Sequence, residues 1–270
     1  MNKIAIIGNG WVGKAMQELF PDAITYVRDL SKVEVPYGFI PPQYSGYTEK
    51  KEEINQCDVA FIAVPTPNID EGKLDTSIVE EVIAWLEVPL IVVRSTVNPG
   101  DCDKWAKKYD KKIVFQPEYL GETPEHPLIN TKKTNFMILG GDKADTRKVI
   151  ELYQTVYNAS VSIRQVSLKE AEIIKLSENR AIAYKVAQAQ ELYDVCEKAG
   201  VDYYTIRDAV YGDDPRFNLW WTFVYPWKRG FQSKCIPKDV YAWAVWAESL
   251  GYDPKITNAM LEKNKEWINA

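Results

Sequence analysis

The chain has 270 residues, enough for one large domain or two ordinary ones with a packed core. Hydrophobic residues make up 46% of the chain and charged residues 26%, which excludes a disordered or fibrous protein. Its 33 basic and 38 acidic residues leave a formal charge of −5, so nucleic acid is not an expected partner. No apolar run approaches the roughly 20 residues that a membrane span needs, and the apolar start is too short for a signal peptide. We therefore expect a cytoplasmic protein without membrane contact.

The first 165 residues alternate short apolar runs with helical patterns. The runs lack polar alternation, which is typical of parallel strands covered on both faces. They cover residues 3–7, 24–27, 59–64, 90–93, 112–115 and 136–139, and helical patterns cover 14–20, 76–86 and 144–157. This alternation predicts an α/β domain with a doubly wound sheet over residues 1–165.

The second part of the chain, residues 166–270, is predicted to be an α-helical domain. Residues 168–199 contain no proline or glycine, so they predict one long helix or two abutting ones, which Gly200 would end. The rest has helical patterns apart from an irregular stretch, 212–239. The dense aromatic residues at 217–227 are more typical of packing, as at a homodimer surface, than of a ligand site.

A glycine motif follows the first predicted strand and precedes the first helix. Gly8 allows a tight turn, Gly10 lets the backbone approach a pyrophosphate, and Gly13 permits close helix packing. Trp11 and Val12 lie at the start of the helix, where unpaired N–H groups can bind phosphates. The strand, turn and helix together predict a dinucleotide-binding Rossmann domain.

The end of the second predicted strand bears on the choice of dinucleotide. Asp29 is the acidic residue placed to hold the ribose hydroxyls of NAD. Arg28 beside it would instead suit the 2′-phosphate of NADP. We favour NAD, with NADP left open.

The four cysteines and the single histidine limit the chemistry further. The cysteines form no CxxC pair, and the lone His126 excludes a multi-histidine metal centre, so no metal is expected. An enzyme with this composition would work with carboxylates, lysine or cysteine. Three cysteines lie in strand or helix contexts typical of buried residues, whereas Cys235 lies in a loop between basic residues. The other three are Cys57, Cys102 and Cys196.

Several polar motifs resemble, in order, those of the UDP-glucose/GDP-mannose dehydrogenase family. They are VPTP at 64–67, STV at 95–97, PEYLGE at 117–122, AEIIKLSEN at 171–179 and CIPKD at 235–239. The resemblance runs from residue 3 to about residue 265, and the cysteine motif is its most specific part. It implies a Rossmann domain joined by a long central helix to a helical substrate domain, and a homodimer formed through that helix. It also implies oxidation of a nucleotide sugar, such as UDP-glucose, to the acid with two NAD.

The chemistry of such an oxidation explains why the site would need a cysteine. An aldehyde must gain a nucleophile before it can lose a second hydride, and a thiolate of Cys235 would form a thiohemiacetal and then a thioester. Lys238 would favour the thiolate or meet a phosphate, and the resemblance implies that Asp239 aids proton handling. Lys175 and Asn179, spaced i and i+4, project from one face of the long helix. The resemblance implies that they contact the substrate and stabilise its oxyanion.

The resemblance also assigns roles to loop residues. Glu122 would be the general base for thioester hydrolysis, with Thr96 helping to hold the water. In addition to the glycine turn and Asp29, the residues assigned to the cofactor are Thr66, Thr96, Glu122 and Lys238. In addition to Lys175 and Asn179, the residues assigned to the substrate are Glu118, Tyr119, Leu120, Arg216 and Gly230.

Two departures from the family pattern leave the substrate open. Only 31 residues follow Asp239 (270 − 239), so we expect no third domain that grips the nucleotide. The loop before Cys235 reads GFQSKC where the family has Gly-x-Gly-Gly-x-Cys, which puts side chains where backbone would approach the substrate.

Two alternatives stand beside this interpretation. A single-step hydroxyacid dehydrogenase would use Lys175 and Asn179 but need no cysteine. A non-catalytic NAD-binding or assembly protein would have no use for Cys235 and its neighbours, so their presence argues against it.

Overall fold

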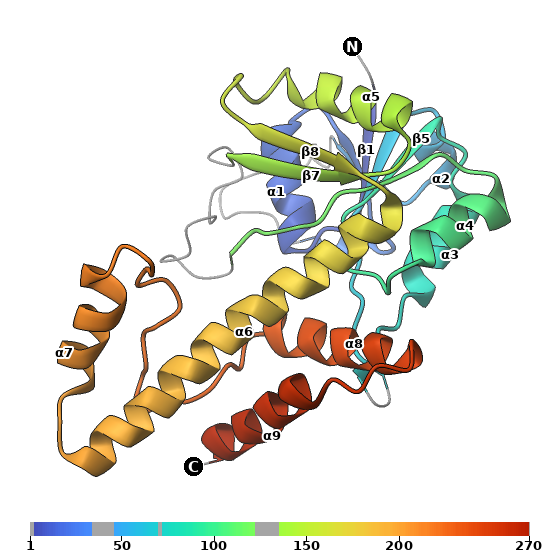
Figure 1. Ribbon diagram of the computed structural model, residues 1–270. Helices are drawn as coiled ribbons and strands as arrows, with labels where there is room; N and C mark the ends of the chain where they lie inside the picture. The colour runs from blue at the N-terminus through green and yellow to red at the C-terminus, as the bar shows by residue number, and fades with distance from the viewer. Residues whose placement is uncertain (1–2, 34–45, 70–71, 122–134, 270) are drawn as a thin grey trace. The chain divides into compact units, whose positions relative to one another are not determined.

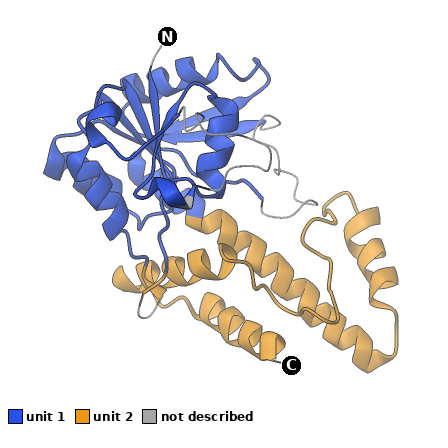
Figure 2. Cartoon of the chain, turned by 180° about the vertical axis from the view of Figure 1, so that it is seen from behind, with its two compact units in different colours: residues 1–67, 74–175 blue, residues 68–73, 176–270 orange. Residues whose placement is uncertain are grey.

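The computed structural model describes residues 3–33, 46–69, 72–121 and 135–269. The chain forms two compact units, one of residues 1–67 and 74–175 and the other of 68–73 and 176–270 (Figure 2). The division falls inside helix α6 (Leu168–Ala199), whose residues 168–175 belong to the first unit. The boundary expected from the sequence, at residue 165, lies just before this helix.

The described residues of the first unit form an eight-stranded sheet in the order β3-β2-β1-β4-β5-β6-β7-β8. The strand order reverses at β1, which pairs in parallel with β2 on one side and β4 on the other, and such a switch point is where open α/β sheets bind ligands. The strands are β1 (Ile4–Ile7), β2 (Ile24–Tyr26), β3 (Tyr47–Thr48), β4 (Val59–Ile62), β5 (Leu90–Val93), β6 (Ile113–Phe115), β7 (Phe136–Gly140) and β8 (Ser162–Val166).

One edge of the sheet departs from the predicted all-parallel arrangement. β7 runs antiparallel to β6, through the single pair Phe115 and Gly140, and β8 pairs in parallel with β7. A buried apolar run looks the same in either strand direction, so the sequence could not show this reversal. β8 is mostly exposed and polar, so it has no apolar run.

Helices cover both faces of the sheet (Figure 1). Alternate residues of β1 point to opposite sides, with Ile6 in the core under α1 and α5 and Ile7 in the core under α3 and α4. The doubly wound α/β fold predicted from the sequence is confirmed. Among the described residues of this unit, the helices are α1 (Trp11–Leu19), the 3₁₀ helix η1 (Leu30–Lys32), α2 (Lys51–Ile54), α3 (Ser77–Trp85), α4 (Asp101–Tyr109) and α5 (Lys143–Tyr153).

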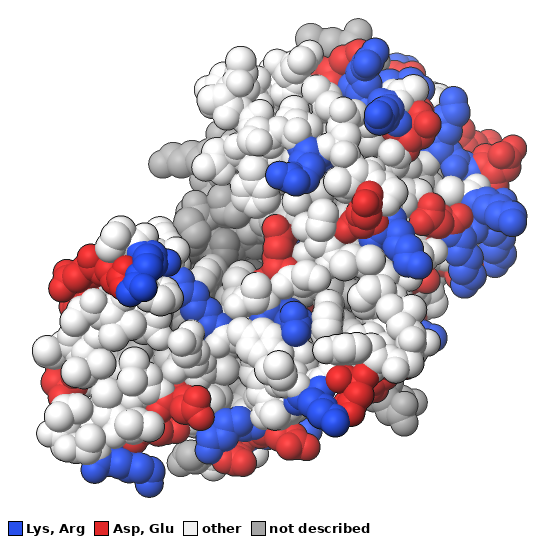
Figure 3. All heavy atoms as spheres, in the orientation of Figure 1, with Lys and Arg blue, Asp and Glu red and all other residues white. Residues whose placement is uncertain are grey.

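The second unit is helical, and the predicted long helix is confirmed as one continuous α6. The other helices are α7 (Tyr203–Arg207), the π-helix η4 (Asp208–Asp213), α8 (Ile236–Ser249) and α9 (Lys255–Asn269). One core of this unit joins Ala183 of α6, Val240 of α8 and Met260 of α9. Among the described residues, no helix is long and apolar enough to cross a membrane. Basic and acidic side chains are interspersed on the face drawn in Figure 3.

Candidate active site

The glycine turn after β1 has the geometry of a phosphate cradle. A Cβ on Gly8, whose φ is +108°, would lie 2.4 Å from the carbonyl oxygen of Ala63, and one on Gly13 would lie 2.0 Å from that of Gly8. Both positions therefore require glycine. No atom lies within 4 Å of a Cβ built on Gly10, so this side of the turn is open, and α1 begins there with Trp11. An open glycine beside a helix N-terminus fits the pyrophosphate of a dinucleotide.

The end of β2 places the two residues on which the choice of dinucleotide depends. Asp29 caps η1, and its Oδ1 accepts hydrogen bonds from the Ser31 N–H at 3.0 Å and the Ser31 hydroxyl at 2.5 Å. Arg28 is exposed and donates to Glu81 Oε2 of α3 at 2.9 Å. Ser31 therefore orients the predicted ribose-binding carboxylate, while Arg28 is held by a residue that the sequence did not single out.

Two hydrogen bonds link the segments that follow β4 and β5. Ser95 Oγ donates to the Val64 carbonyl at 2.7 Å and accepts from the Val64 N–H at 2.9 Å. Thr66 is buried and Thr96 is half-buried, and each follows one of these paired parallel strands. The two predicted cofactor residues thus lie at the same edge of the sheet as the glycine turn.

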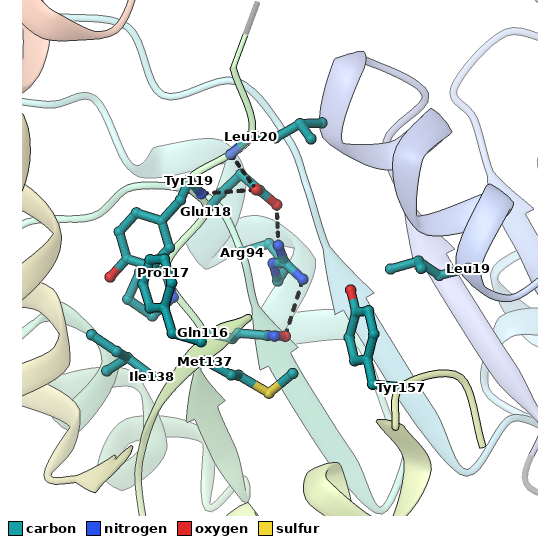
Figure 4. Close-up of a pocket in the computed structure, with 11 residues that line it drawn as sticks. Leu19, Arg94, Gln116, Pro117, Glu118, Tyr119, Leu120, Met137, Ile138 and Tyr157 are labelled. Carbon is teal, nitrogen blue, oxygen red and sulfur yellow. Dashed lines mark hydrogen bonds and ion pairs between the residues drawn. The ribbon is translucent and has the colours of Figure 1, made fainter. Parts of the chain in front are cut away.

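A buried polar network positions the segment that follows β6 (Figure 4). Arg94 Nη1 donates to Gln116 Oε1 at 3.1 Å and to the Tyr153 hydroxyl at 2.9 Å. Arg94 Nη2 forms an ion pair with Glu118 Oε2. Burial raises the pKa of Tyr153 to about 12, which keeps its hydroxyl protonated. No sequence pattern indicated Arg94, Gln116 or Tyr153, because they follow or lie in three separate elements, β5, β6 and α5.

Glu118 shapes the backbone of the predicted substrate segment. Its Oε1 accepts the N–H groups of Tyr119 at 2.8 Å and Leu120 at 2.7 Å, while Arg94 holds the other oxygen. Both carboxylate oxygens therefore have partners within the chain. These contacts fix the course of residues 118–120, and the predicted contact of this segment with substrate stays a prediction.

Lys175 is buried against the same segment. Its Nζ donates to the Glu118 carbonyl at 2.6 Å and lies 5.3 Å from the centre of the Tyr119 ring. The structure thus brings together three of the predicted site residues within the first unit. A buried ammonium beside a carbonyl and an aromatic face is a fixed positive charge.

Trp11 connects the glycine turn to the end of the segment. Its Nε1–H donates to the Gly121 carbonyl at 3.2 Å, across 110 positions of sequence. The next residue, the predicted base Glu122, and the single histidine, His126, lie outside the described residues.

The second unit holds a compact polar cluster around Asp239, which is fully buried. Its Oδ2 accepts a hydrogen bond from Asn179 Nδ2 at 2.5 Å, and its Oδ1 accepts one from Lys238 Nζ at 2.6 Å. Asn179 follows Lys175 by one helical turn on the same face of α6, as predicted. Three predicted residues, two of them from the cysteine motif, therefore meet at one buried carboxylate.

Cys235 is the exposed cysteine and lies at the N-cap of α8. Its carbonyl accepts the Asp239 N–H at 3.0 Å, which fixes the thiol one turn before the buried cluster. The other three cysteines are buried, and burial raises the pKa of the Cys57 thiol and, further, of the Cys102 thiol. Accessibility therefore distinguishes Cys235 from the rest.

Asn68 and Gly72, in the segment that follows β4, pack against α8. Asn68 Nδ2 donates to the Gly72 carbonyl at 2.6 Å and to the Lys238 carbonyl at 3.3 Å. A Cβ on Gly72 would lie 2.7 Å from the Cβ of Tyr241. Asn68 thus supports the backbone of the cysteine motif, a role that no sequence pattern indicated.

Two further predicted substrate residues are held within the second unit. Arg216 is exposed and pairs with Asp214 at 2.6 Å. Gly230 has a φ of +71°, and a Cβ there would lie 2.5 Å from Asn264 Oδ1 of α9. Gly230 therefore serves the packing of its loop, and the predicted substrate contacts of both residues stay predictions.

The fold and the glycine cradle define a dinucleotide-binding protein of the Rossmann class. Residues 41–159 match the NAD binding domain of the UDP-glucose/GDP-mannose dehydrogenase family, and residues 169–266 match the central domain of that family. The chain therefore belongs to the UDP-glucose/GDP-mannose dehydrogenase family, as the resemblance of its motifs predicted.

Individual relatives are distant but similar over most of the chain. UDP-glucose 6-dehydrogenase TuaD of Bacillus subtilis is 28% identical and aligns with 98% of this chain and 63% of its own length. UDP-glucose 6-dehydrogenase of Rickettsia bellii is 28% identical over 80% of this chain and 51% of its own length. The structure of a UDP-glucose dehydrogenase from the archaeon Pyrobaculum islandicum superposes with a TM-score of 0.84 at 25% identity, over 98% of this chain and 68% of that one. The chain thus spans about half to two thirds of the length of the curated relatives.

Proposed function

We propose that the protein is an NAD-dependent nucleotide-sugar dehydrogenase that oxidises UDP-glucose, or a close relative, to the corresponding acid. The observation that carries this proposal is the exposed Cys235 followed, within one helical turn, by the buried Asp239 with its partners Asn179 and Lys238. A binding protein would need neither an accessible thiol nor a buried carboxylate with paired donors. Bound NAD supplies the hydride acceptor for both oxidations.

Lys175 and Asn179 suit the stabilisation of negative charge on the sugar oxygen. The Lys175 ammonium is buried and fixed by the Glu118 carbonyl, so it requires little reorganisation to meet a developing oxyanion. The Asn179 amide donates one N–H to Asp239 and has a second N–H with which it can donate to substrate. Asp239 thereby orients the amide and is the proposed site of proton handling.

Cys235 provides the nucleophile that the second oxidation needs. Its thiolate Sγ forms a bond to the aldehyde carbon, and the aldehyde oxygen takes up a proton to give a thiohemiacetal. Loss of a hydride from that carbon and of the proton from its oxygen gives a thioester on Sγ. Water then breaks the C–S bond, which releases the acid and returns the thiolate. Glu122 is the proposed general base for this water and Thr96 its proposed second contact.

An absorbance assay for NADH against a panel of UDP- and GDP-sugars tests the proposal. We expect turnover of UDP-glucose or of another sugar nucleotide that carries a primary alcohol. Lack of turnover across the panel, by a folded protein that binds NAD, contradicts the proposed activity.

We also propose that the protein is a homodimer joined through the second unit. Several large apolar side chains of this unit are exposed, and Trp227 has 82% of its surface accessible. Apolar surface of this kind is typical of an interface. The aromatic residues concerned are Phe217, Trp220, Phe223, Tyr225 and Trp227.

A further inference from the structure

An ion pair bridges the sheet edge beside the glycine turn. The strand that ends in the turn, β1, has β2 on one side and β4 on the other. Arg28 follows β2, and Glu81 lies in α3, the helix after β4; the Arg28 Nη2 donates to Glu81 Oε2 at 2.9 Å. The ion pair therefore links the end of β2 to α3, the helix that follows β4.

A second contact holds the same face of α3 against the end of β2. The Tyr26 ring packs on the Trp85 ring with their centres 5.2 Å apart. Trp85 follows Glu81 by four residues, so the two side chains lie on one face of α3. Glu81 is thus positioned at Arg28 by the packing of its helix as well as by the ion pair.

The end of β2 carries groups suited to both dinucleotides at adjacent positions. A carboxylate such as Asp29 binds the 2′-hydroxyl of NAD, whereas a guanidinium such as Arg28 binds the 2′-phosphate of NADP. Two carboxylates near Arg28 oppose the phosphate: Glu81 pairs with the guanidinium, and Glu49 Oε1 accepts the Leu30 N–H at 2.6 Å. A 2′-phosphate would therefore meet carboxylates and an arginine that is already engaged.

We propose that Glu81 is a specificity-determining residue that keeps the protein selective for NAD by holding Arg28. The inference rests on the proposed NAD-dependent function. Glu81 acts through Arg28 and the local charge, so it is a positioning residue. Both side chains are about 60% exposed (61% for Arg28 and 59% for Glu81), and an exposed pair is weak enough for one substitution to release the guanidinium.

Titration calorimetry with NAD and with NADP, in the absence of sugar, tests this proposal. We expect Glu81→Gln to lower the Kd for NADP about threefold to fivefold, because an exposed ion pair competes only weakly for the guanidinium, and to change the Kd for NAD by less than about twofold. The matched control is Glu80→Gln, which removes the neighbouring charge of α3. Glu80 pairs with Lys108 at 2.7 Å, so the wild-type ratio of the two Kd values should persist.

The double variant Arg28→Gln/Glu81→Gln separates the guanidinium from the general charge effect. We expect the gain in NADP affinity to disappear in it, because the released arginine is absent. An unchanged Kd for NADP in Glu81→Gln overturns the inference, as does an equal gain of NADP affinity in Glu80→Gln. If the protein still binds NAD, either result leaves the proposed function standing. Failure of the wild-type protein to bind either dinucleotide overturns both.

Discussion

Asp239 is the buried acceptor on which the polar residues of the second unit converge. A fully buried carboxylate is costly unless donors surround it, and Asn179 and Lys238 supply those donors. The resemblance of the motifs at 171–179 and 235–239 to the family indicated these residues. It could not show that they meet, since Asn179 and Asp239 are 60 positions apart.

The different accessibility of the four thiols predicts that alkylation is selective. Cys235 is exposed, whereas Cys57, Cys102 and Cys196 are buried, so iodoacetamide near neutral pH should label Cys235 first. We expect at least a tenfold faster reaction, roughly the contrast between an accessible and a buried thiol, and protection by the sugar nucleotide. Peptide mass spectrometry measures each site. Uniformly slow labelling of all four cysteines, in protein that binds NAD, would favour the non-catalytic alternative.

Other site residues had no sequence signal at all. Arg94, Gln116 and Tyr153 form one network only because β5, β6 and α5 bring them together. Asn68, in the segment that follows β4, supports the Lys238 carbonyl. Such residues are ordinary in composition and isolated in sequence, so only the tertiary fold reveals their role.

At the scale of elements, a side chain from the second turn of α6 caps the N-terminus of α4. Glu172 is fully buried, and its carboxylate accepts the N–H groups of Gly100 at 2.5 Å and Cys102 at 2.9 Å. Burial raises the pKa of Glu172 from 4.5 to about 7, against the opposing effect of these N–H donors. The helix that carries Lys175 is thus tied to α4 by a group that titrates near neutrality.

This raised pKa predicts a falling stability with rising pH. Between about pH 4.5 and 7 the folded state keeps a proton on Glu172 that the unfolded state has lost, so the contribution is full below 4.5 and is lost as pH rises through 7. Its size is roughly 3 kcal/mol in the free energy of unfolding. Urea unfolding from pH 5 to 8 should show a flatter profile for Glu172→Gln than for the wild type. If the stability of the variant and of the wild type changed in parallel with pH, the raised pKa of Glu172 would be contradicted. A pH-independent loss of stability from the missing cap would not affect this comparison.

The elements themselves were largely predictable from the sequence. The uninterrupted pattern of residues 168–199 predicted α6, and the buried runs predicted β1, β4 and β5 because parallel strands are covered on both faces. The direction of β7 and the existence of β8 were not predictable, since pairing at the edge of a sheet depends on neighbours distant in sequence.

At the scale of the whole molecule, the exposed aromatic residues of the second unit bear on assembly. Trp220 is 54% and Trp227 is 82% exposed in the single chain, a large apolar surface to leave in water. We expect light scattering at micromolar concentration to give about twice the 30.9 kDa mass of one chain, because an extensive apolar interface persists on dilution. A stable, fully active monomer would refute the homodimer.

The central claim, that Cys235 makes a four-electron oxidation possible, is tested most directly by the yield of NADH from a limiting amount of the sugar nucleotide. The account predicts two NADH for each substrate molecule, and at most one with the aldehyde as product when Cys235 is changed to serine. Cys196→Ala, which replaces a buried cysteine, is the matched control and should still yield two. A yield of one NADH from the wild type, unaffected by Cys235→Ser, would contradict the account and favour a single-step dehydrogenase.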